Sequence, residues 1–241
     1  NPLYREQGND IVKAAGGGYA IIGLTKETLS GDNDIQLIRI DNDGNVLWTK
    51  NYGYEGDDER GNALVALPDG GFAFVGSAKA DGDIFGDMTI YRVDAAGEIV
   101  WSSVFGSPTA GDEATDILLT DNGTSLVLVG HIETEGKGYL RKYDLDGNVI
   151  WFQPVQLGLA SAFYAATEMA DGSIVATGIV TEFPGADINV LVAKVSASGE
   201  LIWANRAGSP GTVDYGYSIV NTADGGFIIG GYRDLYSAFL P

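Results

Sequence analysis

Four close copies of one eight-residue stretch constrain the fold of this chain more than any other feature. The first copy runs from Asp41 to Trp48 and reads Asp-Asn-Asp-Gly-Asn-Val-Leu-Trp. The other copies end at Trp101, Trp151 and Trp203, so that successive tryptophans lie about 50 residues apart. Self-similarity at such a period is typical of solenoids, propellers and other repeat arrays.

Each copy joins two apolar runs through a glycine turn, a pattern that predicts a β-hairpin. In the first complete unit the pattern predicts four antiparallel strands, over residues 11–15, 19–23, 35–40 and 46–51. The 35 glycines and the short apolar runs favour an all-β chain. A single unit cannot bury its apolar faces without neighbours, so we expect one domain over residues 1–241.

The two ends of the chain predict how the repeats close. First strands occur five times, whereas the last unit ends after a short third strand, Tyr236 to Leu240. Leu3 to Glu6 resemble a fourth strand without a unit of its own. We therefore expect a β-propeller of five four-stranded blades that the N-terminal strand closes, because closure removes exposed sheet edges. The alternative is a fragment of a larger propeller with six to eight blades.

The charge and the missing cysteines exclude several classes of function. The net charge of −19 argues against nucleic acid as a partner, because phosphate binding requires clustered Lys and Arg. No segment approaches the ~18 apolar residues of a transmembrane helix. Without cysteine the chain has no disulfide, no thiol nucleophile and no thiolate metal ligand.

The pattern Asp-x-x-Gly-x-x-x-Trp, as in Asp94 to Trp101, resembles the blade repeat of quinoprotein-like propellers. That family includes alcohol dehydrogenases that use pyrroloquinoline quinone and the non-enzymatic lipoprotein BamB. Its enzymes have larger rings, a catalytic Asp, a calcium ion and often a vicinal cysteine pair, and no residue here matches those positions. The resemblance implies a binding or scaffold protein without a cofactor. It also implies an extracytoplasmic location, secreted, periplasmic or lipid-anchored, with a leader absent from this chain.

Acidic loops raise the question of a metal site. The stretches that begin at Asp41 and Asp144 resemble the opening of an EF-hand, but they lack its remaining ligands, so we predict hairpin turns. The acids before third strands, Asp34, Asp87, Asp187 and Asp234, are either a cation-binding ring or local backbone acceptors, and we expect the latter. The best local calcium candidate combines Asp87 with Asp81 and Asp83. We predict no metal site.

The tryptophans and the single histidine have structural and functional interpretations. A periodic Trp is more often a wedge between neighbouring sheets than an exposed surface for sugar stacking. His131 follows Gly130 at the end of a second strand, near a loop rim. Without cysteine or a second histidine it cannot form a typical zinc site. We expect a surface or half-buried residue without a special role, and a catalytic role stays an alternative.

The starts of the first strands supply the candidate site. In a radial array these segments lie near the axis, and they carry Asp10, Asn62, Asp116, Tyr164, Asp214 and Tyr217. Mixed carboxylates and tyrosines in a concave surface suit a neutral polar ligand such as a glycan, or a basic loop of a protein partner. Long, variable loops at the same face favour binding there.

Two functions follow from this site. The first is a non-enzymatic binding or scaffold propeller whose ligand meets the loop face. The alternative is a glycoside hydrolase, because that chemistry needs two carboxyl groups about 5–9.5 Å apart. Asp10, Asp116 and Asp214 are the carboxylates that would serve it. The regularity of the repeats favours binding.

Overall fold

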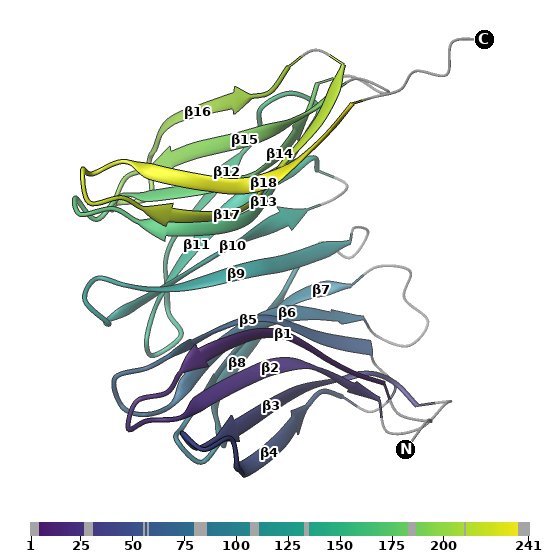
Figure 1. Cartoon of the computed structure of the whole chain (residues 1–241), viewed down its shortest axis with the longest axis vertical. Coiled ribbons are helices and arrows are strands. Elements are labelled where there is room, and N and C mark those ends of the chain that lie inside the picture. The colour runs from purple at the N-terminus through teal and green to yellow at the C-terminus, as the bar shows by residue number, and fades with distance from the viewer. Residues whose placement is uncertain are drawn as a thin grey trace.

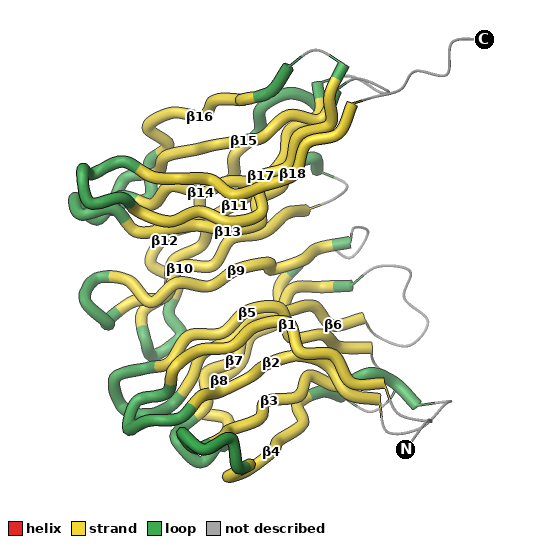
Figure 2. The backbone as a smooth tube through the Cα atoms, in the orientation of Figure 1, coloured by secondary structure: helices red, strands yellow, loops and turns green. Residues whose placement is uncertain are grey.

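The chain folds into β-strands joined by turns (Figure 2). The computed structural model describes residues 5–26, 31–54, 56, 58–79, 86–106, 111–132, 135–182, 187–209 and 211–235. These residues form the strands β1 (Arg5–Lys13), β2 (Tyr19–Lys26), β3 (Asp34–Ile40), β4 (Val46–Tyr52), β5 (Asp58–Ala66), β6 (Phe72–Lys79), β7 (Asp87–Val93), β8 (Ile99–Phe105), β9 (Asp112–Thr120), β10 (Ser125–Ile132), β11 (Lys137–Asp144), β12 (Val149–Val155), β13 (Ala160–Glu168), β14 (Ile174–Thr181), β15 (Ile188–Val195), β16 (Leu201–Ala207), β17 (Thr212–Asn221) and β18 (Phe227–Leu235).

Four antiparallel sheets account for most of these strands (Figure 1). Sheets one to four contain β1–β4, β5–β8, β9–β12 and β13–β16, each paired in chain order. The terminal hairpin, β17 with β18, joins sheet four through one parallel pair, Ile188 with Val213. The prediction of a four-stranded antiparallel unit is therefore confirmed for four units.

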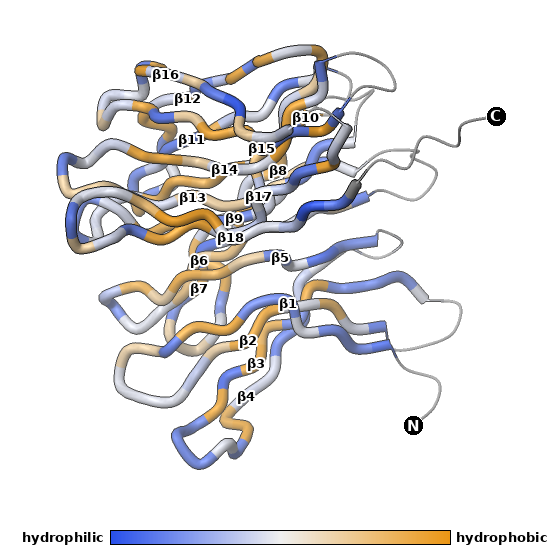
Figure 3. Tube along the Cα trace, turned by 45° about the horizontal axis from the view of Figure 1, so that its top comes forward, coloured by the Kyte–Doolittle hydropathy of each residue, from blue (hydrophilic) through white to orange (hydrophobic). Residues whose placement is uncertain are grey.

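The sheets pack face to face, and their first strands meet. Contacts join β1, β5, β9, β13 and β17 in that order. Between sheets one and two, buried Ile22 and Leu37 pack with Phe74 and Tyr91 of the next sheet. Corresponding clusters fill the spaces between the later sheets. The apolar residues lie within the strands, whereas the turn between β3 and β4 is largely hydrophilic (Figure 3).

The repeated tryptophans are half-buried wedges between sheets. The indole N–H of Trp101 donates to the backbone oxygen of Leu145 at 2.8 Å, and its ring stacks on Tyr143 of sheet three. Trp151 donates in the same way to Ala197 of sheet four, at 3.1 Å. A Cβ on Gly147 would lie 3.0 Å from the ring of Trp101, so this turn needs glycine. The wedge interpretation is confirmed.

The acidic turns satisfy their own backbone groups. The carboxylate of Asp41 accepts the backbone N–H of Asp43 at 2.9 Å and of Asn45 at 2.8 Å. Asp144 accepts the corresponding groups of its own turn. Hydrogen bonds from Asn45 lower the pKa of Asp41, so the carboxylate form is favoured. The prediction that these stretches are hairpin turns is confirmed.

The proposed closing strand is wrong for the two residues that can be checked. Arg5 and Glu6 begin β1, where they face Lys26 and Thr25 of β2. Gly8 also lies inside this strand, next to a bulge. The rest of the predicted contact, residues 3–4 and 236–240, lies outside the described residues. Within the described strands no pairing joins sheet one to the terminal hairpin, so the number of blades and the larger-ring alternative stay predictions.

Candidate functional site

Every first strand carries a β-bulge at the same place. The pairing with the second strand skips one residue in each case, and we call the skipped residues the bulge row: Asn9, Asn62, Thr115, Tyr164 and Tyr217. A bulge leaves its extra residue outside the ladder and re-aims its side chain. Three of the predicted site residues, Asn62, Tyr164 and Tyr217, belong to this row.

The first three members of the bulge row tie neighbouring sheets together. Asn9 donates from Nδ2 to the backbone oxygen of Gly61 at 2.7 Å. Asn62 donates to Ala114 at 2.9 Å, and Thr115 donates from Oγ1 to Phe163 at 2.8 Å. In each case the acceptor precedes the bulge of the next first strand. These residues therefore form a belt of hydrogen bonds across sheets one to four.

The last two members make ring contacts instead. The ring centroids of Tyr164 and Tyr217 lie 5.7 Å apart, and Tyr217 stacks on Tyr215 at 5.4 Å. Tyr215 in turn contacts Tyr232 of β18 at 6.2 Å. We call these four residues the tyrosine cluster. Tyr217 is 53% exposed and Tyr232 is 50% exposed, so the cluster presents aromatic surface to solvent.

Two of the predicted carboxylates are clamps on the backbone. Asp10 accepts the N–H of Leu64 in the next sheet at 3.0 Å, through Oδ2. Asp116 accepts the N–H of Ala166 in the next sheet at 2.9 Å. The second oxygen of each carboxylate accepts the N–H of the following residue in its own strand. Both residues lie one position beyond the bulge row and serve the contacts between sheets.

The third predicted carboxylate is also engaged. Asp214 is buried, forms an ion pair with Arg233 and accepts a hydrogen bond from Thr212 at 2.6 Å. These partners, Arg233 first, lower the pKa of Asp214. The structure therefore brings together Asn62, Tyr164 and Tyr217 in one row, and it assigns all three carboxylates to structural contacts.

Two side chains have pKa values that bear on chemistry. Burial raises the pKa of Asp116 to about 6, although two backbone N–H groups oppose this shift and Asp10 adds to it. Burial, followed by the neighbouring tyrosines Tyr215 and Tyr217, raises the pKa of Tyr164 to about 12. The Tyr164 hydroxyl thus stays protonated at neutral pH, and Asp116 titrates nearer neutrality than an ordinary carboxyl group.

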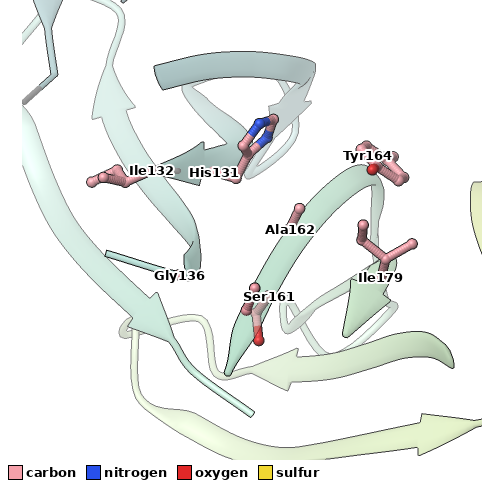
Figure 4. Close-up of a pocket in the computed structure, with 8 residues that line it drawn as sticks. His131, Ile132, Gly136, Ser161, Ala162, Tyr164 and Ile179 are labelled. Carbon is pink, nitrogen blue, oxygen red and sulfur yellow. The ribbon is translucent and has the colours of Figure 1, made fainter. Parts of the chain in front are cut away.

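A pocket of about 210 Å³ lies between sheets three and four. Its lining includes His131, Ile132, Ser161, Ala162, Tyr164 and Ile179 (Figure 4). We call it the apolar pocket, because aliphatic side chains supply much of its wall. Tyr164 lines this pocket and also contacts Tyr217, so the pocket adjoins the tyrosine cluster.

A second pocket of about 220 Å³ lies on the other side of His131, between sheets two and three. Its lining includes Arg60, Asp112, Glu113 and His131, and we call it the polar pocket. His131 is half-buried, as expected. The position of this residue between two pockets could not be predicted from the sequence, because its neighbours come from three different sheets.

The structure offers no cluster of metal ligands within the described residues. Asp187 accepts the backbone N–H of Gly211, a residue of the next unit, at 2.9 Å. The prediction that Asp187 bonds only to local backbone groups is therefore wrong. Asp234 accepts a hydrogen bond from the Tyr232 hydroxyl at 2.9 Å. Asp81 and Asp83 lie outside the described residues.

No helix in the described part of the chain has the length and apolarity of a membrane span.

Similarity to other proteins is confined to the fold. No family model and no curated protein matches the sequence. The structure resembles hydrazine synthase from Kuenenia stuttgartiensis, with a TM-score of 0.60 and 15% identity over 90% of this chain. The chain spans 53% of that protein. It also resembles Sqt1 from Chaetomium thermophilum, with a TM-score of 0.48 and 12% identity, over 90% of this chain and 65% of the other.

The fold is β-propeller-like. This conclusion rests on the four-stranded sheets, whose first strands meet, together with the similarity to the hydrazine synthase chain. At such low identity the similarity does not extend to activity. The resemblance of the repeats to quinoprotein-like blades and the extracytoplasmic location stay predictions.

Sequence reasoning missed several residues of the bulge row and of the tyrosine cluster. Asn9, Thr115, Tyr215 and Tyr232 were not among the candidates. One signal was available, because Gly8-Asn9 repeats Gly61-Asn62 within the first strands. For Tyr232 no such signal exists, since it reaches the cluster from β18.

Proposed function

We propose that the protein is a non-enzymatic binding or scaffold propeller whose ligand meets the tyrosine cluster and the apolar pocket. The observation that carries this proposal is the change within the bulge row. Asn9, Asn62 and Thr115 use the bulge for hydrogen bonds between sheets. Tyr164 and Tyr217 replace that bond with an aromatic surface beside a pocket. Exposed tyrosines next to a concave apolar site favour recognition of a ligand.

A scaffold role fits the rest of the molecule. The packed sheets supply a stable frame, and side chains from β10, β13, β14, β17 and β18 meet at one place on it. We further propose that the protein works outside the cytoplasm, on the basis of the repeat pattern alone. The ligand is a glycan or a protein partner.

A glycoside hydrolase is the alternative, and one observation favours it. The pKa of Asp116 is raised to about 6, which is a property of general acids in such enzymes. However, both oxygens of Asp116 accept backbone N–H groups, as do both oxygens of Asp10. A carboxyl group in this arrangement would have to break a contact between sheets in order to act on a substrate. Binding without turnover therefore agrees better with the geometry.

Glycan and peptide arrays probed with the labelled protein test the proposal, with product analysis on every bound glycan. We expect at least one probe that binds to the wild type and to Tyr54→Ser but not to Tyr217→Ser. We expect no hydrolysis of any bound glycan. Tyr54 is a matched control, because it is 55% exposed and lies in the loop after β4, outside the tyrosine cluster. Hydrolysis that disappears in Asp116→Asn or Asp10→Asn would establish the hydrolase instead. Absence of any Tyr217-dependent binding would refute the proposal.

A further inference from the structure

We propose that the ligand is a basic polypeptide segment that inserts one apolar side chain into the apolar pocket. This inference rests on the proposed function and specifies its ligand. It follows from three features of the site: the size and lining of the apolar pocket, the charge around it, and the geometry of the tyrosine cluster.

The apolar pocket fits a single side chain. Its volume of about 210 Å³ lies below the ~300–1,000 Å³ of pockets that enclose small molecules. Ile132, Ala162 and Ile179 contribute aliphatic wall, while His131 and Tyr164 stand at the sides nearest the polar pocket and the tyrosine cluster. Protein interfaces commonly place one buried anchor residue in such a pocket, with aromatic residues around it.

The surroundings of the pocket favour a positively charged ligand. The basic residues at the loop ends of sheets three and four and the hairpin each lie in an ion pair: Lys137 with Glu135, Arg206 with Glu182, and Arg233 with Asp214. Glu113 in the polar pocket and Asp187 before β15 add further negative charge. The polar pocket itself sets two carboxylates against the guanidinium of Arg60. With a net charge of −19 over the chain, complementary charge would accelerate and orient the docking of a basic segment.

The tyrosine cluster is a platform rather than a cage. The rings of Tyr215 and Tyr217 are nearly parallel, with an interplanar angle of 15° and a centroid distance of 5.4 Å. Tyr164 and Tyr217 are 30° from parallel at 5.7 Å. An ammonium group cannot enter between rings that already touch, so the cluster does not enclose a lone cation on several sides. Rigid exposed tyrosines instead offer broad contact area to an extended chain at a small entropy cost.

Binding of short labelled peptides to the full chain, followed by fluorescence anisotropy, tests this inference. The probes are Lys-Lys-X-Lys-Lys with X as Leu, Ile, Met, Phe or Ser, together with Glu-Glu-Leu-Glu-Glu. We expect at least one apolar X to bind about tenfold more tightly than Ser, because it buries a side chain. Added salt should weaken all lysine peptides to a similar degree. The glutamate peptide should not bind.

Three variants connect the tenfold preference to the site. Ala160 is exposed at the rim of the apolar pocket, so Ala160→Trp should fill the pocket and abolish the preference. Tyr217→Ser should reduce it, and Tyr54→Ser should leave it unchanged. Unfolding temperatures near that of the wild type verify that each variant is folded. If Ala160→Trp does not fold, the binding preference of Tyr217→Ser is the test of the site.

The outcomes separate this inference from the proposed function. Equal affinity for X as Leu, Ile, Met, Phe and Ser would show attraction by charge alone and would overturn the inference. Binding of the glutamate peptide would overturn it as well. If only glycans bind, and they require Tyr217, the binding function stands while the basic segment is wrong. If neither class of probe binds, both proposals fail.

Discussion

Sheets one to four contact one another through hydrogen bonds at the bulge row, whereas sheet four contacts the terminal hairpin through aromatic rings at the same row. The contacts among sheets one to four use Asn9, Asn62 and Thr115 as donors to the next first strand. The contact between sheet four and the hairpin has Tyr164 and Tyr217 at the equivalent positions, and their rings meet. One bulge therefore serves as a structural tie in one region and as a presentation site for aromatic side chains in the other.

This difference shows where a repeat protein has room for function. A first strand that already pairs with its second strand does not need every inter-sheet hydrogen bond. Once sheets one to four are tied, the last position of the row is free to carry a side chain chosen for a ligand. The clamps follow a different pattern. Asp10 and Asp116 act between sheets one and two and between sheets three and four. The corresponding residues of β5, β13 and β17 are Ala63, Ala165 and Ser218.

The largest expected effect concerns the tryptophan wedges. Trp101→Ala should lower the free energy of unfolding by about 3 kcal/mol, because it opens a cavity and removes the hydrogen bond to Leu145. Trp203→Ala should lower it by about half as much. Trp203 packs against the apolar cluster of Val175, Val192 and Ile219, but among the described residues its indole N–H has no acceptor like Leu145. Chemical denaturation of both variants measures the difference. Equal losses would mean that the last contact is as well built as the earlier ones.

The next effect is a pH dependence at the clamp between sheets three and four. Because the folded pKa of Asp116 is raised to about 6 from an ordinary value of 3.8, folding favours the protonated carboxyl group. Its contribution to stability is fully present below pH ~4 and is lost as the pH rises to ~6. The loss amounts to roughly 3 kcal/mol, because each unit of pKa difference is worth about 1.4 kcal/mol.

Asp116→Asn removes this titration and provides the comparison. The difference in unfolding free energy between wild type and Asp116→Asn should move in favour of the variant between pH 4 and 6, and then stay constant. Asp10→Asn, at the equivalent clamp between sheets one and two, controls for the loss of a carboxylate acceptor. A difference that does not change with pH would contradict the raised pKa.

The sequence predicted the repeating unit, its turns and its tryptophan wedges, because these depend on local chemistry. Asp41 and Gly44 determine a hairpin through bonds within a few residues. The direction of a side chain in the first strand is harder to predict. A bulge shifts the alternation of a strand by one residue, and such a shift moves a side chain to the other face. The sequence pattern does not show this shift, so it could not separate Asn62 and Tyr164, which lie in the bulge row, from Asp10 and Asp116, which lie one residue further along and are clamps.

A smaller effect tests the hydrogen-bond belt directly. Asn62→Ala should destabilise the protein by about 1–2 kcal/mol, because Ala114 and Glu113 both lose a donor. Asn62→Thr should recover part of this loss, since Thr115 makes the equivalent bond with a hydroxyl group. Thermal unfolding of Asn62→Ala and Asn62→Thr, compared with the wild type, measures both effects. If Asn62→Ala is as stable as the wild type, the belt does not distinguish the early sheets from the hairpin.

The smallest expected effect on stability is at Tyr217, and it sharpens the comparison most. Tyr217 occupies the same bulge position as Asn62, but half of its surface is exposed and its described contacts are the rings of Tyr164 and Tyr215. Tyr217→Ser should therefore lower the free energy of unfolding by only about 0.5 kcal/mol, a loss typical of an exposed aromatic contact. Tyr54→Ser should cost about as little. A loss at Tyr217 as large as the loss in Asn62→Ala would mean that the tyrosines, too, are ties between sheets. A small loss, together with lost binding, would mean that this one position of the row serves a ligand.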